Sequence, residues 1–440
     1  MSAPTIDTSA YEPDVDATQR STRDKVLMWV GVGLFGLFVL SVVQQLTGAT
    51  ELLSAGTWGA TVRLAVPIML AGLGGLYSER SGIVNIGLEG MMIAGAWFGA
   101  WAGWMYGPWQ GVALGIAGGM AFGLVHALAT VTFAVDQIVS GVAIILLAGG
   151  VTRFLSVVSY DAESGGGATQ SPRIQSLIQT FDLNLADLLR IDVPIISGVL
   201  NISDMFNDIA GREIFYVSDL AAFVAGLTTR MSWLTLIALA MVPVTWFVLW
   251  RTPWGLRLRS CGENPWAAES LGVPVLRMKY WGVIISGGLA GMGGAYLVMV
   301  QAGIYREGMV AGRGFIGLAA LIFGNWYPLG VLAGSTLFGY ADALSLRSQP
   351  AAVNALLLVF AIGLLVYAGY LIWTGKRTAA IVWALGALAF LAWYLIADGV
   401  PQQVVTALPY LVTLFVLALF TQRLRMPAAD GVRYRKGSAL

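Results

Sequence analysis

The chain has 440 residues, of which 57% are hydrophobic and 11% are charged, and its formal net charge is +1. Soluble globular proteins carry about 25% charged residues, so this composition excludes a water-soluble globular protein and predicts one with many membrane spans. The single cysteine, Cys261, excludes an intrachain disulfide and a metal site built from cysteines.

Residues 1–25 are polar and acidic, and we interpret them as a disordered cytoplasmic tail. The apolar run that follows, 26–46, is longer than the hydrophobic region of a signal peptide and lacks a cleavage site. It is therefore predicted to be the first span of a transmembrane domain over residues 26–425. Residues 426–440 are predicted to form a second cytoplasmic tail.

About 20 apolar residues in a helix cross a bilayer core of about 30 Å. The runs are apolar throughout and lack the alternation of barrel strands, so helices are expected. Candidate spans lie at 26–46, 57–77, 87–106, 110–134, 137–158, 232–250, 280–301, 314–325, 328–346, 352–374, 378–397 and 403–421. The run 314–325 is short and predicts a half-helix or re-entrant piece. The predicted fold class is an all-α polytopic membrane protein with about 10–12 transmembrane helices.

Positive charges predict the orientation, because cytoplasmic loops are enriched in Lys and Arg. Counting spans from a cytoplasmic N-terminus puts the basic clusters near 20–25, 251–279, 376–377 and 423–436 on the inside. The segment 159–231 then lies outside, and it carries nine acidic residues against four basic ones. Both termini are therefore expected in the cytoplasm.

The external segment 159–231 contains amphipathic pieces at 174–178 and 185–189. They favour a small cap of interfacial helices, although a plain solvated loop fits the same composition. His126, the single histidine, lies within an apolar run and could be at most one metal ligand or one proton carrier. A hydrogen-bonded role in helix packing is the favoured interpretation.

The cytoplasmic loop 251–279 contains a well-capped short helix over 264–272. Asn264 suits the N-cap, Pro265 the first helical position, and Gly272 the left-handed position after the last turn. This helix is flanked by arginines and carries no catalytic constellation. It therefore favours docking of a cytoplasmic partner over chemistry, and an ordinary interfacial loop with basic anchors is the alternative.

Charges and glycines interrupt the apolar runs between residues 77 and 92. Ionisable groups within a membrane are costly and usually functional. Glu79 and Arg80 are predicted to pair with each other, and Glu89 is the most isolated charge. Broken helices of this kind recur where transporters line a pathway or a hinge.

At these residues the chain resembles the permease subunits of bacterial ABC importers, of the branched-chain amino acid and simple-sugar permease superfamily. Residues 78–92 resemble the nucleoside type, which works with a basic-membrane-protein-like lipoprotein receptor. Residues 262–268 are similar to the loop that docks the ATPase, and residues 286–296 and 311–326 to the two spans that follow. The long outer segment and the extra span near 378–397 depart from the usual pattern.

The resemblance implies an importer in the bacterial cell membrane. An extracellular substrate-binding lipoprotein delivers a nucleoside-like solute to two permease subunits, the second usually a paralogue, and a cytoplasmic ABC ATPase drives their alternation. The chain lacks a GxxxxGK[ST] phosphate loop, so ATP hydrolysis is expected on a separate chain. No cofactor, metal or nucleic acid is expected, and membrane lipid surrounds the spans.

Two sets of site residues follow. ATPase coupling is expected at Glu263, Asn264, Pro265, Trp266, Glu269 and Leu271, with Trp266 and Leu271 packing into a groove of the ATPase and the two glutamates contacting basic residues there. The translocation pathway is expected at Asn85, Glu89, Arg313 and Asn325, because a neutral nucleoside needs only scattered polar partners. Helix packing or interfacial anchoring is the alternative for each pathway residue.

Three other functions remain open at this point. The same fold could import simple sugars or branched-chain amino acids, because the receptor would select the substrate. An ion-coupled secondary transporter would need a carboxylate near the midplane, for which Glu89, Asp136 and Asp342 are candidates. A polytopic membrane enzyme fits poorly, since the chain has one histidine, one cysteine and no paired acidic motif.

Overall fold

The structure is a computed structural model that describes residues 22–182, 202–212, 214–347, 350–396 and 424–437, with isolated positions between 400 and 411. The predicted tail 1–25 lies almost wholly outside the described residues, as do the amphipathic piece 185–189 and most of the predicted span 403–421. Two short strands, β1 (Thr180–Phe181) and β2 (Met231–Ser232), pair antiparallel. Everything else with regular structure in the described ranges is helical, which confirms the predicted all-α fold class.

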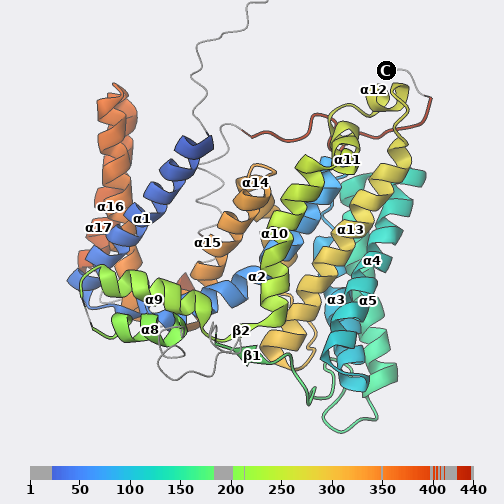
Figure 1. Cartoon of the computed structure of the whole chain (residues 1–440), viewed down its shortest axis with the longest axis horizontal. Helices are drawn as coiled ribbons and strands as arrows, with labels where there is room; N and C mark the ends of the chain where they lie inside the picture. The colour runs from blue at the N-terminus through green and yellow to red at the C-terminus, as the bar shows by residue number, and fades with distance from the viewer. Residues whose placement is uncertain are drawn as a thin grey trace, which may run out of the picture.

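The long helices run roughly side by side between two ends of the molecule (Figure 1). In chain order they are α1 (Thr22–Thr47), α2 (Ala55–Arg80), α3 (Leu88–Met105), α4 (Pro108–Ala127), α5 (Gln137–Tyr160), α10 (Trp233–Arg251), α13 (Val275–Tyr296), α15 (Pro328–Arg347), α16 (Pro350–Trp373) and α17 (Arg377–Ile396). Among the described residues, eight helical segments are long and apolar enough to cross a membrane. The chain is therefore a multi-pass membrane protein.

The short helix α14 (Arg313–Phe323) has 11 residues. At 1.5 Å per residue it is about 16 Å long, which is half of a bilayer core. The run predicted to be a half-helix at 314–325 is therefore a half-length helix. It is followed by a tight turn in which Asn325 and Trp326 both have positive φ, and α15 then returns toward the opposite end.

The core is formed by α2, α3, α4 and α13, which approach one another through glycines. A Cβ placed on Gly95 would lie 2.3 Å from the Cα of Gly291, and one on Gly119 would lie 2.1 Å from the carbonyl oxygen of Gly287. Small residues at such crossings let helix backbones touch, which is the usual basis of packing within a membrane. Of the eight candidate spans among the described residues, those that contain α2 and α13 are the most buried.

At one end of the molecule lie the two short helices α11 (Pro253–Glu263) and α12 (Pro265–Ser270) and the C-terminal segment 424–437 (Figure 1). We call this the α12 end. The opposite end carries α8 (Ile202–Ala210), α9 (Val217–Thr228) and the two strands. The helical hairpin α16–α17 stands at the side of the molecule, away from α3, α4 and α5.

The amphipathic piece 174–178 is not helical, contrary to the expectation of an interfacial helix. Its backbone binds the chain after α13 instead: the amide of Ile174 donates to the carbonyl of Gly303 at 2.9 Å, and that of Ile178 to Met299 at 3.3 Å. Both isoleucine side chains are buried there. Tertiary partners on another element therefore override the local helical pattern, and in the described part of this segment the helices are α8 and α9.

Candidate functional site

The α12 end is built by a chain of local caps. The side chain of Thr252 accepts from the amide of Gly255 at 3.1 Å and starts α11, with Pro253 in its first turn. Asn264 ends α11 and starts α12, because its Oδ1 accepts from the amide of Ala267 at 3.0 Å. Gly272 has φ +81° just after the helix. The capped helix predicted at 264–272 is therefore present, with helical residues over Pro265–Ser270.

The predicted coupling residues divide into those that face solvent and those that are held by the protein. Leu271 is 85% exposed and Asn264 is also exposed, whereas Pro265 is buried. The ring of Trp266 packs edge-on against Tyr434, with centroids 5.9 Å apart. Glu263 forms an ion pair with Arg80 at 3.5 Å and accepts from the amide of Ala428 at 3.3 Å. Glu269 is half-buried and hydrogen-bonds the hydroxyl of Tyr434.

Arg80 and Glu79, at the end of α2, do not form the mutual pair expected from the sequence. Arg80 pairs with Glu263 and donates to the carbonyl of Trp326 at 2.8 Å, while Glu79 accepts from the indole Nε1 of the same tryptophan at 2.5 Å. Adjacent residues on a helix point in different directions, so each finds a partner on another element. Together they join α2 to the turn between α14 and α15.

Two predicted pathway residues, Asn85 and Glu89, hold the broken segment after α2 in place. Asn85 is fully buried and its amide nitrogen donates to the hydroxyl of Ser286 on α13 at 2.9 Å. Glu89 accepts from the amides of Gly312 and Gly314 at 2.8 and 2.7 Å. These amides lie at the start of α14, where backbone N–H groups lack partners within the helix and favour a negative charge. Glu89 therefore caps the half-length helix.

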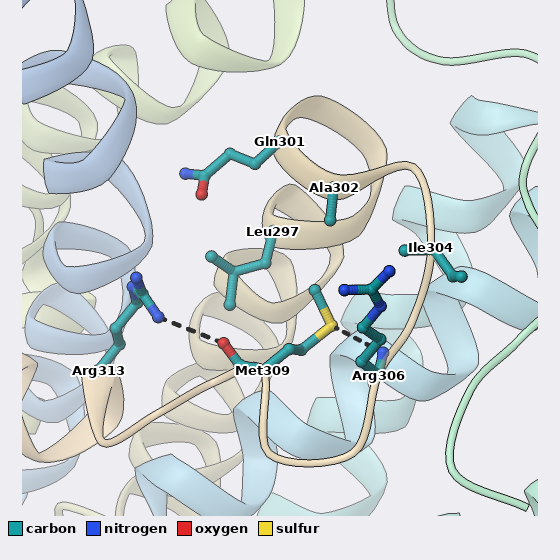
Figure 2. A pocket seen from close by; sticks show the side chains of 7 residues that line it. All are labelled: Leu297, Gln301, Ala302, Ile304, Arg306, Met309 and Arg313. Atoms are coloured by element: carbon teal, nitrogen blue, oxygen red, sulfur yellow. Dashed lines mark hydrogen bonds between the residues drawn. The ribbon is translucent and has the colours of Figure 1, made fainter. Parts of the chain in front are cut away.

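Arg313 lies beside a cavity of about 370 Å³, shown in Figure 2. Its guanidinium donates to the carbonyls of Met309 and Val310 and pairs with Asp342 at 3.3 Å. In Figure 2, Arg306 lies across from Arg313, with Leu297 and Met309 between them. The seven residues around the cavity thus combine hydrogen-bond donors with an apolar wall.

Gln301 adds an amide group at the same cavity. Its nitrogen donates to the carbonyl of Arg63 at 2.7 Å, so its carbonyl oxygen is left as the acceptor that can face a solute. A cavity of this size, with few polar groups and apolar walls, suits a small organic molecule. Within the described ranges, no three His, Cys, Asp or Glu side chains come together as metal ligands do.

Asn325 lies away from the cavity, in the turn beyond the other end of α14. Its Oδ1 accepts from the backbone amide of Arg425 at 2.6 Å. The structure therefore brings Glu89 and Arg313 together at the start of α14, while Asn325 belongs to the α12 end. His126 is buried between Ser140, at 2.9 Å from its Nδ1, and the carbonyl of Val84, in keeping with the helix-packing interpretation.

Comparison with known proteins matches residues 59–348 to a family described as the permease component of branched-chain amino acid transport systems. The chain belongs to this family. It is therefore a transporter permease subunit, and the matched region runs from the start of α2 to the end of α15. The hairpin α16–α17 lies beyond the match.

Three members of the permease family are similar to this chain over two thirds of its length or more. The guanosine ABC transporter permease protein NupQ of Bacillus subtilis is 33% identical over 86% of this chain and 96% of its own length. The nucleoside ABC transporter permease protein NupC of Lactococcus lactis is 31% identical over 84% of this chain and 94% of its own. A putative glucose ABC transporter permease protein of Haloferax volcanii, TsgC13, is 36% identical over 67% and 78%. No solved structure gives a significant match.

Several residues of the permease's α12 end were not singled out from the sequence. Tyr434 and Asp430, in the C-terminal segment, are both buried, and Lys279 at the start of α13 is fully buried and donates to the carbonyl of Gly82 at 3.1 Å. Burial raises the pKa of the Asp430 carboxyl from its ordinary value to about 7, although Lys279 and Arg80 nearby oppose the rise. The polar composition of the C-terminal segment indicated a solvated tail, and only its tertiary contacts reveal otherwise.

Proposed function

We propose that this chain is a permease subunit of an ATP-driven importer that carries nucleosides across the bacterial cell membrane. The observation that supports this most is the match over nearly the whole length of two permeases named for guanosine and nucleosides. Simple sugars are the second candidate, because a putative glucose permease is 36% identical over a shorter stretch. Branched-chain amino acids, named in the family description, come third.

The α12 end is proposed to face the cytoplasm, with both termini on that side. Basic residues of the loop 251–279 and of the C-terminal segment 424–437 lie at this end of the molecule, as the positive-inside tendency requires. The segment 159–231, which includes α8 and α9 at the opposite end, carries more acidic than basic residues. The end with α8 and α9 then faces outward. There it would meet the extracellular lipoprotein that delivers the solute.

ATP hydrolysis is proposed to occur on a separate cytoplasmic ABC ATPase that docks on α12. The exposed side chain of Leu271, at the end of the capped helix α12, supports this assignment. The rest of the proposed coupling set is Glu263, Asn264, Pro265, Trp266 and Glu269. The relatives include two permeases from each of two organisms, NupP with NupQ and NupB with NupC. A paralogous second permease subunit is therefore the proposed partner within the membrane.

The translocation pathway is proposed to pass the cavity beside α14. Arg313 and Gln301 offer a donor and an acceptor to a neutral nucleoside, while the apolar wall limits how tightly the solute is held. Asn85 and Glu89 would fix the broken segment and the start of α14, where Arg313 lines the cavity, and Asn325 would close the turn at the inner end. Weak polar contacts suit a pathway that must release its solute.

Uptake of radiolabelled guanosine tests the substrate, in cells that carry the receptor, the ATPase and the second permease, with or without this chain. We expect ATP-dependent uptake that is lost without the chain and competed by other nucleosides. Uptake that persists without the chain, or that sugars or branched-chain amino acids compete away, contradicts the nucleoside assignment.

The coupling role is tested by replacing Glu263 and Trp266 together with alanine. We expect ATP hydrolysis to continue while uptake falls, because α12 loses the ring contact of Trp266 and the corner before it loses the ion pair of Glu263. Ser270→Ala is the matched control, since Ser270 is exposed on the same helix. Uptake equal to that of the control variant would argue against coupling through α12.

A further inference from the structure

The C-terminal segment 424–437, which we call the tail, crosses the α12 end beside α11 and α12 (Figure 1). Its backbone is bound to the corner between those two helices. The amide of Ala429 donates to the carbonyl of Gly262 at 2.8 Å, and that of Ala428 donates to the carboxylate of Glu263 at 3.3 Å. Both acceptors lie within two residues of Asn264, at which α12 begins.

Side chains of the tail reach α12 itself. Tyr434 is only 6% exposed, and its ring meets Trp266 edge-on. Such ring pairs contribute beyond the apolar area that they bury. The tail therefore contacts α12 through this aromatic pair and binds the end of α11, just before α12, through its backbone.

The same tail is anchored to three other parts of the membrane domain. The amide of Arg425 donates to Asn325 in the turn after α14, and Arg433 pairs with Asp136 at the start of α5 at 3.5 Å. Asp430 is buried where the ends of α2 and α13 meet, near Glu79 and Lys279. The tail thus joins α11 and α12 to spans that lie on several sides of them.

A six-residue helix cannot hold its own position, because helices this short are unstable without tertiary packing. Within α12 only Pro265 and Ala268 are buried. A lever that transmits force must be fixed to the elements it moves. The tail places the buried Asp430 beside the end of α2 and binds the turn after α14, which borders the half-length helix beside the cavity.

We propose that the tail is a strap that positions α12 against the membrane spans, so that displacement of α12 by the ATPase reaches α2 and α14. Ala429 and Tyr434 are its positioning residues: Ala429 through its amide at the helix corner, and Tyr434 through its ring on Trp266. This inference rests on the proposed importer function. Beyond that function, the inference says that the tail holds the coupling surface in place.

The test uses the complete reconstituted complex of receptor, both permeases and ATPase, and measures ATP hydrolysed per guanosine transported. Tyr434→Ala removes the ring, and Ala429→Pro removes the amide donor. Tyr434→Phe keeps the ring and removes only the hydroxyl that hydrogen-bonds Glu269 of α12, so it should be affected less than Tyr434→Ala. Val432→Ala is the matched control, because Val432 is 41% exposed on the same tail.

We expect Tyr434→Ala and Ala429→Pro to raise ATP consumption per guanosine by about twofold to tenfold, the range that loss of one such ring pair gives in an equilibrium. The complexes should still assemble, and the amides of α12 should exchange hydrogen faster. An unchanged ratio overturns the strap. Loss of ATPase binding also overturns it, because the tail would then belong to the ATPase-binding surface itself.

Failure of the proposed substrate is distinguishable from failure of the strap. If the wild-type complex hydrolyses ATP but moves no guanosine, the nucleoside assignment fails. The strap is then judged by hydrogen exchange of α12 in the assembled complex, in which Tyr434→Ala and Tyr434→Phe must differ. Equal exchange in these two variants overturns it.

Discussion

Replacing Gly119 with alanine should destabilise the membrane domain strongly, because the position lies at the crossing of α4 and α13. The new Cβ would lie 2.1 Å from the carbonyl oxygen of Gly287 and 2.7 Å from the Cα of Gly291. Real Cβ atoms essentially never approach another heavy atom within 3.0 Å. All of these neighbours are backbone atoms, so no side chain can rotate away.

The magnitude follows from how far the two helices must part. Clearing the carbonyl oxygen requires a shift of about 0.9 Å, and a gap of that size forfeits a quarter to a half of the dispersion attraction across the contact. Overpacking a core lowers the free energy of unfolding by about 1–3 kcal/mol. The loss for Gly119→Ala should lie at the upper end of this range, because the backbone cannot yield.

The assay is the unfolding temperature of the purified permease in detergent, followed by tryptophan fluorescence. Gly150→Ala on α5 is the matched control, because a Cβ there meets nothing within 4 Å. Alanine is the better helix former, so this control should be stabilised by about 0.5–1 kcal/mol. The packing argument is refuted if Gly119→Ala unfolds at or above the temperature of the wild type.

Three further outcomes are expected. A double-mutant cycle of Arg313→Gln and Asp342→Asn on the unfolding temperature should reveal a coupling of about 1 kcal/mol, since the pair is only partly buried, and additive effects would contradict it. Asn264→Ala should lower the stability of α12 by about 1 kcal/mol and speed hydrogen exchange at the Ala267 amide. Asn264→Asp keeps a capping oxygen and should do neither. Burial raises the pKa of Asp430 to about 7, so the contribution of this carboxyl to the stability of the folded state is fully present below its ordinary pKa and is lost as pH rises to about 7. Proteolysis of the tail should therefore quicken between about pH 4 and about pH 7 in the wild type and less steeply in Asp430→Asn, which keeps the neighbouring Glu79, and equal pH profiles would refute this.

The sequence by itself determined the parts of the fold that depend on local chemistry. Long apolar runs must be helical in a membrane, because every backbone polar group needs a partner within its own segment. The boundaries of α5, α10, α14 and α15 accordingly fall within two residues of the predicted runs. Asn264, Pro265 and Gly272 act within one turn of the helix, so the capped helix α12 was also readable from the sequence.

Tertiary structure alone decided which polar groups meet. Glu79 and Arg80 are neighbours in sequence but bind Trp326 and Glu263, because a helix turns adjacent side chains toward different elements. Glu89 and Arg313 meet at the start of α14 although more than two hundred residues separate them.

The segments at both ends of the molecule also depended on long-range partners. Residues 174–178 have a helical pattern but bind the backbone after α13, and the polar C-terminal tail buries Tyr434 against Trp266. Neither contact can be predicted from the hydrophobic pattern of the segment itself, because each depends on residues that lie far away in the sequence. The sequence thus specified the spans and their caps, and the packed structure specified the cavity, the strap and the partners of each charge.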